Sequence, residues 1–271
     1  TKAPDDFNLD ENTYTAVISN NGDVISIENE AGKGFADSPK KGKITLTKYD
    51  SRYPDHVLTD ATFELFEDTN QNGEYDEGDT SLGNLIEGTD KEIGTYSRDE
   101  LRMGTYFVHE TNAPEGFNLD NGYYKATLTE DKQVFVVSNR GDNADFATGF
   151  YNDIKRGNVE ITNTDIVTSE GLPNTGIKIY NSDMEVIFEG RTDETGKITF
   201  EDLPYGNYFY QEFDAPEGYV LDESLFKFEI REDGVTVKAE MKDKAITGNV
   251  EITKTDIARS EERRVGKECR S

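Results

Sequence analysis

Cysteine, tryptophan and histidine are almost missing from this chain of 271 residues, which has one cysteine, no tryptophan and two histidines. The single Cys269 excludes an internal disulfide framework. His56 and His109 belong to no repeated pattern, and neither lies near a serine or cysteine that could serve as a nucleophile. The sequence also has no glycine-rich phosphate loop, no zinc-type Cys/His cluster and no basic aromatic patch. We therefore expect that the protein is not an enzyme that turns over a substrate.

Positive charge and long apolar runs are scarce as well. Asp and Glu number 56 against 29 Lys and Arg, which gives a net charge of -27. Such a chain repels phosphate backbones and anionic lipids, so nucleic acid and membrane surfaces are excluded as partners, whereas divalent cations become candidates. No apolar run approaches the roughly 18 to 20 residues of a membrane span. Only 34% of the residues are hydrophobic, which indicates several thin cores instead of one thick core.

Repetition is what the sequence does contain. Two phrases each occur three times and alternate along the chain. One occurs as TKAPDDFNLD (1–10), TNAPEGFNLD (111–120) and DAPEGYVLD (214–222). The other occurs as GKITLTKYD (42–50), GNVEITNTD (157–165) and GNVEITKTD (248–256). Self-similarity at a fixed period is typical of tandem domains.

The repeats predict the domain boundaries. We expect the C-terminal part of one repeat over 1–41, a full repeat over 42–156 and a second full repeat over 157–247. The segment 248–271 should hold the first strand of a further repeat and an atypical tail, because residues 258–271 leave the repeated pattern and turn basic. No signal peptide is present, but the chain opens inside a repeated phrase, so this observation carries no information.

Within each unit, apolar residues alternate with period two over short runs that are bounded by Gly, Asp and Asn. This pattern is typical of half-buried strands, and no run has the helical period of 3.6. We predict an all-β protein of tandem antiparallel β-sandwiches, prealbumin-like or immunoglobulin-like, with about seven strands each.

The repeated phrases resemble the collagen-adhesin B-type (Cna B) repeats, prealbumin-like domains of Gram-positive adhesin stalks and pilins. The resemblance rests on ITLTKYD, on the phrase GxYxxxE followed by APEGF or APEGY, and on a last strand that ends in Asn or Asp five residues before the next Gly. It implies an extracellular, cell-wall-anchored protein whose anchor is outside this segment and whose neighbouring repeats are its partners. The alternative is a module whose loops bind a host extracellular protein or glycan, which an exposed apolar patch on one repeat only would favour.

In that family, a Lys of the first strand and an Asn or Asp of the last strand form an intramolecular isopeptide bond with the help of a Glu. The matching residues here are Lys48, Asn152 and Glu110. Strand alternation independently turns Lys48 to the same face as Ile44 and Leu46, and burial in a dry site would neutralise both Lys48 and Glu110. The competing interpretations are an inward Lys–Glu ion pair and a lysine whose amine reaches water at the end of its strand.

The other repeats depart from this pattern. The second full repeat has Glu212 and Asp243, but Asn163 stands in the place of the lysine. Without an amine no bond can form, so we expect a hydrogen-bonded polar cluster with at least one protonated carboxyl group. Asp37 resembles an acceptor whose lysine is missing upstream, and Lys254 resembles a donor whose acceptor is missing downstream.

The first full repeat alone contains the insertion DTNQNGEYDEGD, over 68–79. Its oxygen donors have the spacing of a calcium-binding EF-hand loop, with a glycine at the sixth place. They are Asp68, Asn70, Asn72, Glu74, Asp76 and Asp79. The last place holds Asp instead of Glu, and the flanking segments are predicted strands instead of helices. The loop is therefore either a calcium site or a solvated acidic hairpin.

LPNTG, over 172–176, looks like the sortase signal of Gram-positive surface proteins. A sorting signal is followed by an apolar span, whereas this one is followed by nearly a hundred polar residues. Alignment of the repeats places Leu172 opposite Leu58 and Ile177 opposite Phe63. We therefore interpret the motif as the start of a strand, which would have to unravel before a sortase could cut it.

Overall fold

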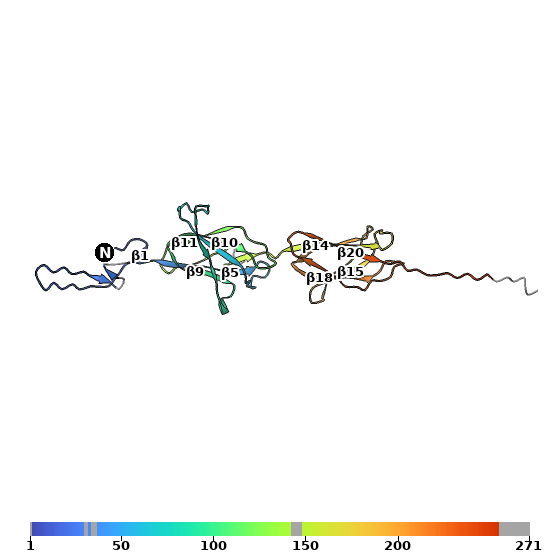
Figure 1. Ribbon diagram of the computed structural model, residues 1–271, viewed down its shortest axis with the longest axis horizontal. Coiled ribbons are helices and arrows are strands. Elements are labelled where there is room, and N and C mark those ends of the chain that lie inside the picture. The colour runs from blue at the N-terminus through green and yellow to red at the C-terminus, as the bar shows by residue number, and fades with distance from the viewer. Residues whose placement is uncertain (1, 30–31, 34–36, 142–147, 255–271) are drawn as a thin grey trace, which may run out of the picture. The chain divides into compact units, whose positions relative to one another are not determined.

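The computed structural model describes residues 2–29, 32–33, 37–141 and 148–254, and the tail at 258–271 with Cys269 lies outside them (Figure 1). The described part of the chain is built from strands, with a single short 3-10 turn, η1 (Asp90–Glu92). The all-β prediction is confirmed. Two β-sandwiches follow one another along the chain.

The first sandwich has two sheets. One has the strand order β11-β10-β6-β7, and the other has the order β12-β5-β9-β8, with β13 also paired to β5. The strands are β5 (Lys41–Asp50), β6 (Thr62–Glu67), β7 (Thr80–Asn84), β8 (Ile86–Glu87), β9 (Thr95–Arg102), β10 (Gly104–Asn112), β11 (Tyr123–Leu128), β12 (Val134–Val136) and β13 (Phe150–Asn152). These nine strands exceed the expected seven, because β8 is a short addition and the last strand is divided into β12 and β13.

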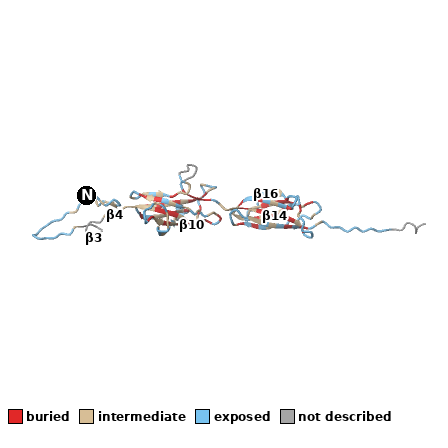
Figure 2. Ribbon diagram, turned by 90° about the horizontal axis from the view of Figure 1, so that it is seen from above, coloured by how far each residue is buried: buried red, intermediate tan, exposed pale blue. Residues whose placement is uncertain are grey.

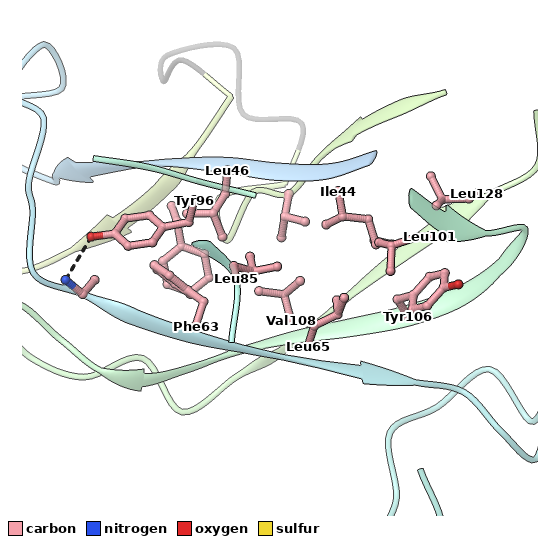
Figure 3. Packing of buried hydrophobic residues seen from close by; sticks show 14 residues of the cluster. Ile44, Leu46, Phe63, Leu65, Leu85, Tyr96, Leu101, Tyr106, Val108 and Leu128 are labelled. Carbon is pink, nitrogen blue, oxygen red and sulfur yellow. Dashed lines mark hydrogen bonds between the residues drawn. The ribbon is translucent and has the colours of Figure 1, made fainter. Parts of the chain in front are cut away.

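Side chains from both sheets meet in the core of this sandwich. Along β5 buried and half-buried residues alternate over its whole length, as period-two patterning requires. Ile44 and Leu46 of β5 thereby face Phe63, Leu65 and Val108 of the opposite sheet (Figure 3). The dashed line in Figure 3 marks the hydroxyl of buried Tyr96, which accepts a hydrogen bond from the backbone nitrogen of Ala61 at 3.0 Å. Full burial of each such aliphatic side chain stabilises the fold by about 1.5 to 3 kcal/mol.

The end of the first sandwich lies beside its beginning. Both β12 and β13 run parallel to β5, with Phe150 opposite Lys48 and Asn152 opposite Asp50. The other strand pairs of this sandwich are antiparallel, as predicted, and these two are the exceptions. Parallel neighbours need a crossover instead of a hairpin, and the rest of the sandwich serves as that crossover between β5 and β13.

The second sandwich has the seven strands that the sequence predicts. Its sheets have the orders β17-β14-β20 and β16-β15-β18-β19. The strands are β14 (Arg156–Asp165), β15 (Gly176–Tyr180), β16 (Val186–Arg191), β17 (Lys197–Pro204), β18 (Gly206–Asp214), β19 (Phe226–Ile230) and β20 (Thr236–Asp243). β14 repeats the alternating burial of β5, with Val159 and Ile161 in the core. Figure 2 shows the buried residues in the interior of each sandwich.

The flanking segments contain little regular structure. Before the first sandwich, β1 (Phe7–Asn8) pairs with β4 (Ser38–Pro39), and β2 (Glu28–Asn29) pairs with β3 (Gly32–Lys33). The strand expected from residue 248 is not formed over 248–254, where Val250 and Ile252 are each 86% exposed. A strand needs a neighbour for its backbone groups, and in the described residues this segment has none. No helix in the described chain is long and apolar enough to span a membrane.

Candidate functional site

Three polar side chains meet in the interior of the first sandwich. Lys48 is the fourth buried residue in the alternation of β5, Glu110 lies on β10 of the opposite sheet, and Asn152 ends β13. Lys48 and Glu110 are 0% exposed, and Asn152 is 2% exposed. The structure thus brings the three predicted residues to one place between the sheets.

The amide of Asn152 is held by the carboxyl group of Glu110. Its Nδ2 atom lies 2.9 Å from Oε1 and 2.8 Å from Oε2 of Glu110. Oε2 also accepts a hydrogen bond from the backbone nitrogen of Asp120 at 2.9 Å. The Oδ1 atom of Asn152 is buried and has no hydrogen-bond partner. A buried carbonyl oxygen without a hydrogen-bond donor costs free energy, and the Oδ1 atom of Asn152 lacks such a donor.

The Lys48 amine lies within the same buried region. Its Nζ donates to the carbonyl oxygens of Tyr49 at 3.3 Å and Phe150 at 3.4 Å, both weak contacts. Among the described residues it forms no ion pair, and its full burial keeps the amine from water. The geometry therefore matches neither the inward ion pair nor the lysine that reaches solvent.

Burial shifts the proton affinity of both groups toward their neutral forms. It lowers the pKa of Lys48 to about 8, although the charge of Glu110 partly opposes this shift. Burial likewise raises the pKa of Glu110. A neutral amine is a nucleophile and a protonated carboxyl group is a proton donor. Burial therefore favours the two forms that these roles need, the neutral amine of Lys48 and the protonated carboxyl group of Glu110.

The corresponding place in the second sandwich holds two carboxyl groups and no amine. Asn163, Glu212 and Asp243 are all buried, and Nδ2 of Asn163 donates to Oδ2 of Asp243 at 2.7 Å. Burial and the neighbouring Asp243 raise the pKa of Glu212 to about 7, and burial raises the pKa of Asp243. Oε2 of Glu212 accepts a hydrogen bond from the backbone nitrogen of Asp222 at 2.8 Å, as Oε2 of Glu110 does from that of Asp120 in the first sandwich. The arrangement is the hydrogen-bonded polar cluster that the sequence predicts.

LPNTG lies folded beside this cluster. Leu172 donates from its backbone nitrogen to the carbonyl oxygen of Asn163 at 2.9 Å, as Leu58 does to Lys48 at 2.9 Å. Asn174 has a positive φ of 64°, and Asp60 at the aligned place has 63°. The motif is thus the turn that leads into β15, with Thr175 fully buried.

The hydroxyl of Thr175 belongs to the polar cluster, which sequence reasoning did not foresee. It accepts a hydrogen bond from Nδ2 of Asn163 at 3.0 Å. The aligned residue in the first sandwich is Ala61. Asn163 and Thr175 together therefore fill the space that Lys48 and Ala61 fill in the first sandwich. The alignment of the repeats contains this exchange and could have predicted it.

The acidic loop of the first sandwich is held by its own side chains. Asp68 is buried and accepts hydrogen bonds from the backbone nitrogens of Asn72 and Gly73. The side-chain amides of Asn70 and Asn72 both donate to Oδ2 of Asp76, at 2.8 and 2.6 Å. Within the described chain, no group of three or more His, Cys, Asp or Glu side chains is arranged to hold a metal ion.

The two remaining predicted residues lie apart from any such site. Asp37 is half-buried, and its Oδ1 accepts a hydrogen bond from the backbone nitrogen of Asp10 at 3.2 Å. Lys254 is exposed in the extended segment after the second sandwich.

Comparison with known proteins agrees with the repeat alignment. The family model described as SpaA, prealbumin-like fold domain, matches residues 42–142 and 157–245. Serine-aspartate repeat-containing protein D of Staphylococcus aureus (strain Newman) is 29% identical over 177 residues, which are 57% of this chain and 13% of that protein. A fibrinogen-binding protein of Staphylococcus epidermidis is 26% identical over 216 residues, which are 72% of this chain and 18% of that protein. The chain thus spans less than a fifth of the length of these curated relatives.

A solved structure is similar to this chain. The Bacillus anthracis TIE protein matches with a TM-score of 0.60 and 29% sequence identity, over 78% of this chain and 35% of that chain. The matched ranges cover the first sandwich up to β12 and the second sandwich from Gly157 to the end of β20, and both sandwiches repeat the same buried pattern of first strand, glutamate and last strand. The chain therefore belongs to the SpaA family of prealbumin-like fold domains, as a tandem of two.

Proposed function

We propose that this chain is a structural stalk segment of a cell-wall-anchored adhesin or pilus of a Gram-positive bacterium. Its first sandwich closes itself by an isopeptide bond between Lys48 and Asn152. The observation that carries the proposal is the burial of an amine, a carboxyl group and an amide in one place between two sheets. Tandem prealbumin-like domains, the Staphylococcus relatives and the strongly acidic composition support an extracellular spacer whose partners are neighbouring repeats.

The chemistry follows from the neutral forms of the two titratable groups. The Lys48 Nζ atom attacks Cγ of Asn152, a new Nζ–Cγ bond forms, and the Cγ–Nδ2 bond breaks. Glu110 carries the proton of the amine to the departing nitrogen, which leaves as ammonia. A 180° rotation of the Asn152 amide would place its unpartnered Oδ1 against Glu110, where a protonated carboxyl group would donate to it and polarise the carbonyl. The reaction occurs once in each molecule and is not turnover.

The bond would stabilise the folded sandwich because it restricts the conformations of the unfolded chain. It would close a loop of 104 positions (152 − 48 = 104). By analogy with a disulfide of that size, the lost chain entropy corresponds to about 4 to 5 kcal/mol. An amide is not reduced by thiols, so a surface protein with this bond has no need of cysteine.

Intact-mass spectrometry of the purified chain tests the bond. We expect a mass lower by one ammonia than the sequence requires, and a branched peptide that joins Lys48 to Asn152. Lys48→Ala and Glu110→Gln should restore the full mass, whereas Glu212→Gln, at the equivalent place in the second sandwich, should still lack one ammonia. A full mass for the unaltered chain would contradict the proposed bond.

We also propose calcium as a ligand of the loop at 68–79. The carboxylates of Asp68, Asp76 and Asp79, the amides of Asn70 and Asn72, and the carbonyl oxygen of Glu74 would hold the ion. One oxygen of Asp79 is buried without a partner, and two asparagine amides converge on one oxygen of Asp76. Rotation of these two amides would present their oxygens instead of their NH2 groups. Calcium would stiffen the loop without a part in the amide chemistry.

A second candidate function is binding of a host protein through the second sandwich. Its edge strand β16 exposes 48% of Val186, 37% of Ile187 and 41% of Phe188, an apolar edge of the kind that an extended peptide can extend. Because one relative is named as a fibrinogen-binding protein, immobilised fibrinogen is the first probe. Fibrinogen binding that is abolished by Val186→Lys would support this second function. If the unaltered chain does not bind fibrinogen, only the stalk function is supported.

A further inference from the structure

The last strand of the first sandwich is held by a side chain outside both sheets. Strand β13 has three residues, and its middle residue is Tyr151. The backbone nitrogen of Tyr151 donates to Oδ1 of Asn139 at 2.8 Å, and its carbonyl oxygen accepts from Nδ2 of Asn139 at 2.8 Å. The amide of Asn139 therefore pairs with Tyr151 as the backbone of a neighbouring strand would. It fixes the residue that directly precedes Asn152.

Asn139 is in turn bound to the loop that contacts Glu110. Its Nδ2 donates to Oδ2 of Asp120 at 2.7 Å, and the hydroxyl of Tyr124 donates to the same oxygen at 2.7 Å. The backbone nitrogen of Asp120 donates to Oε2 of Glu110 at 2.9 Å. A continuous hydrogen-bonded path thus runs from Glu110 through Asp120 and Asn139 to Tyr151.

The second sandwich has only the first part of this path. The backbone nitrogen of Asp222 binds Glu212 as that of Asp120 binds Glu110. In the described residues, however, the Asp222 carboxylate accepts a single hydrogen bond, from the backbone nitrogen of Ser224, and no side chain joins it to β20. The full path is therefore present in the sandwich that has the amine and missing from the one that lacks it.

We propose that Asn139 and Asp120 are positioning residues for formation of the Lys48–Asn152 bond, an inference that rests on the proposed function of the first sandwich. Attack requires Nζ to reach Cγ at about 3 to 3.5 Å along a defined direction. A three-residue strand in a parallel pair holds its end weakly, since parallel pairing is slightly less stable per residue. The path fixes the acceptor strand and Glu110 relative to each other. Asn139 does not touch the reacting atoms, and Asp120 touches them only through its backbone nitrogen, which donates to Glu110.

The charge of Asp120 acts on the two reacting groups in opposite ways. Its negative charge raises the pKa of Lys48, which opposes the neutral amine, and also raises the pKa of Glu110, which favours the proton donor. Burial is the larger cause of both shifts. These two effects of the charge oppose one another, so the expected effect of the path is geometric.

The rate of bond formation in the full chain tests the inference. The chain is made by cell-free synthesis, stopped at intervals in acid and denaturant, and weighed for the loss of one ammonia. Asn139→Asp keeps the acceptor for Tyr151 and loses both donors, and we expect it to react about 10-fold more slowly. Asn139→Ala should react up to about 100-fold more slowly. Two control variants should react at the unaltered rate: Asn121→Ala, an exposed change in the Asp120 loop, and Asp222→Asn, a change at the position of the second sandwich that corresponds to Asp120.

Folding is measured separately so that a structural loss is not mistaken for a positioning effect. Each change is repeated with Lys48→Ala, which prevents the bond, and the thermal midpoint is recorded. We expect a small fall in the midpoint beside the large fall in rate. If Asn139→Ala does not fold, the test uses Tyr124→Phe, which removes one hydrogen bond to Asp120. This variant must form the Lys48–Asn152 bond more slowly than Asn121→Ala. Equal rates in all variants of a chain that still forms the bond would overturn the positioning role, whereas a full mass in the unaltered chain would refute the bond itself.

Discussion

Installing the missing amine in the second sandwich is the strictest test of the proposed chemistry. Asn163 occupies the place of Lys48, and Thr175 occupies the place of the smaller Ala61. The double change Asn163→Lys with Thr175→Ala therefore reproduces the donor side of the first site. Glu212 and Asp243 already provide the proton carrier and the acceptor. The new amine would attack Cγ of the protonated Asp243 carboxyl group, and water would leave in place of ammonia.

The size of the effect follows from the positions of the two ends. The bond would close a loop of 80 positions (243 − 163 = 80), and the corresponding loss of chain entropy is worth about 4.5 kcal/mol. For a domain of this size, that corresponds to a rise of roughly 20 °C in the thermal midpoint of the second sandwich. In the unaltered chain burial raises the pKa of Glu212 to about 7, so the Glu212 carboxyl group can hold a proton in mildly acidic solution.

Intact mass and calorimetry measure the outcome. The double variant should lose one water in addition to the ammonia of the first sandwich, and digestion should yield a branched peptide that joins positions 163 and 243. Adding Glu212→Gln should prevent the loss of water and remove the gain in midpoint. A folded double variant that keeps its full mass after long incubation between pH 5 and 9 would refute the idea that only the amine is missing.

Three further outcomes are expected. The second sandwich should lose stability as pH rises from about 4.5 to about 7, because the folded pKa of Glu212 lies above its unfolded value; full ionisation costs about 3 kcal/mol, and Glu212→Gln should flatten the thermal midpoint against pH. Lys48→Ala should lower the thermal midpoint of the first sandwich by roughly 20 °C and leave that of the second unchanged. If the first sandwich has the same midpoint in Lys48→Ala and in the unaltered chain, the result argues against the bond. Calcium should raise the midpoint of the first sandwich only, and Asp68→Asn should abolish the rise, as calorimetry with chelator can show.

Local alternation carried most of the correct predictions. The period-two pattern of β5 placed Lys48 in the interior because burial on a strand depends only on the parity of the position. Alignment of the repeats then identified Asn163 as its counterpart, which the matching backbone bonds of Leu58 and Leu172 support. The same alignment explained LPNTG as the start of β15, since a repeated turn needs a repeated backbone conformation.

Features that depend on contacts distant in sequence could not be predicted in this way. The parallel pairing of β13 with β5 is a property of the whole chain path and leaves no mark on either strand. The pairing of the Asn139 amide with the backbone of Tyr151 is likewise invisible, because a single polar residue in a loop has no period. The strand expected from residue 248 shows the reverse case, since its sequence fits a strand and a neighbour to pair with is missing in the described chain.

The parallel arrangement of β5 and β13 determines how the first sandwich would carry a pulling force. The chain enters at the start of β5 and leaves at the end of β13, and the two strands lie side by side in the same direction. Tension between these two points would slide one strand along the other and load their hydrogen bonds together, instead of opening them one after another. An amide between Lys48 and Asn152 would carry this load directly across the sheet, so that the residues between them would bear almost no tension while the protein is stretched.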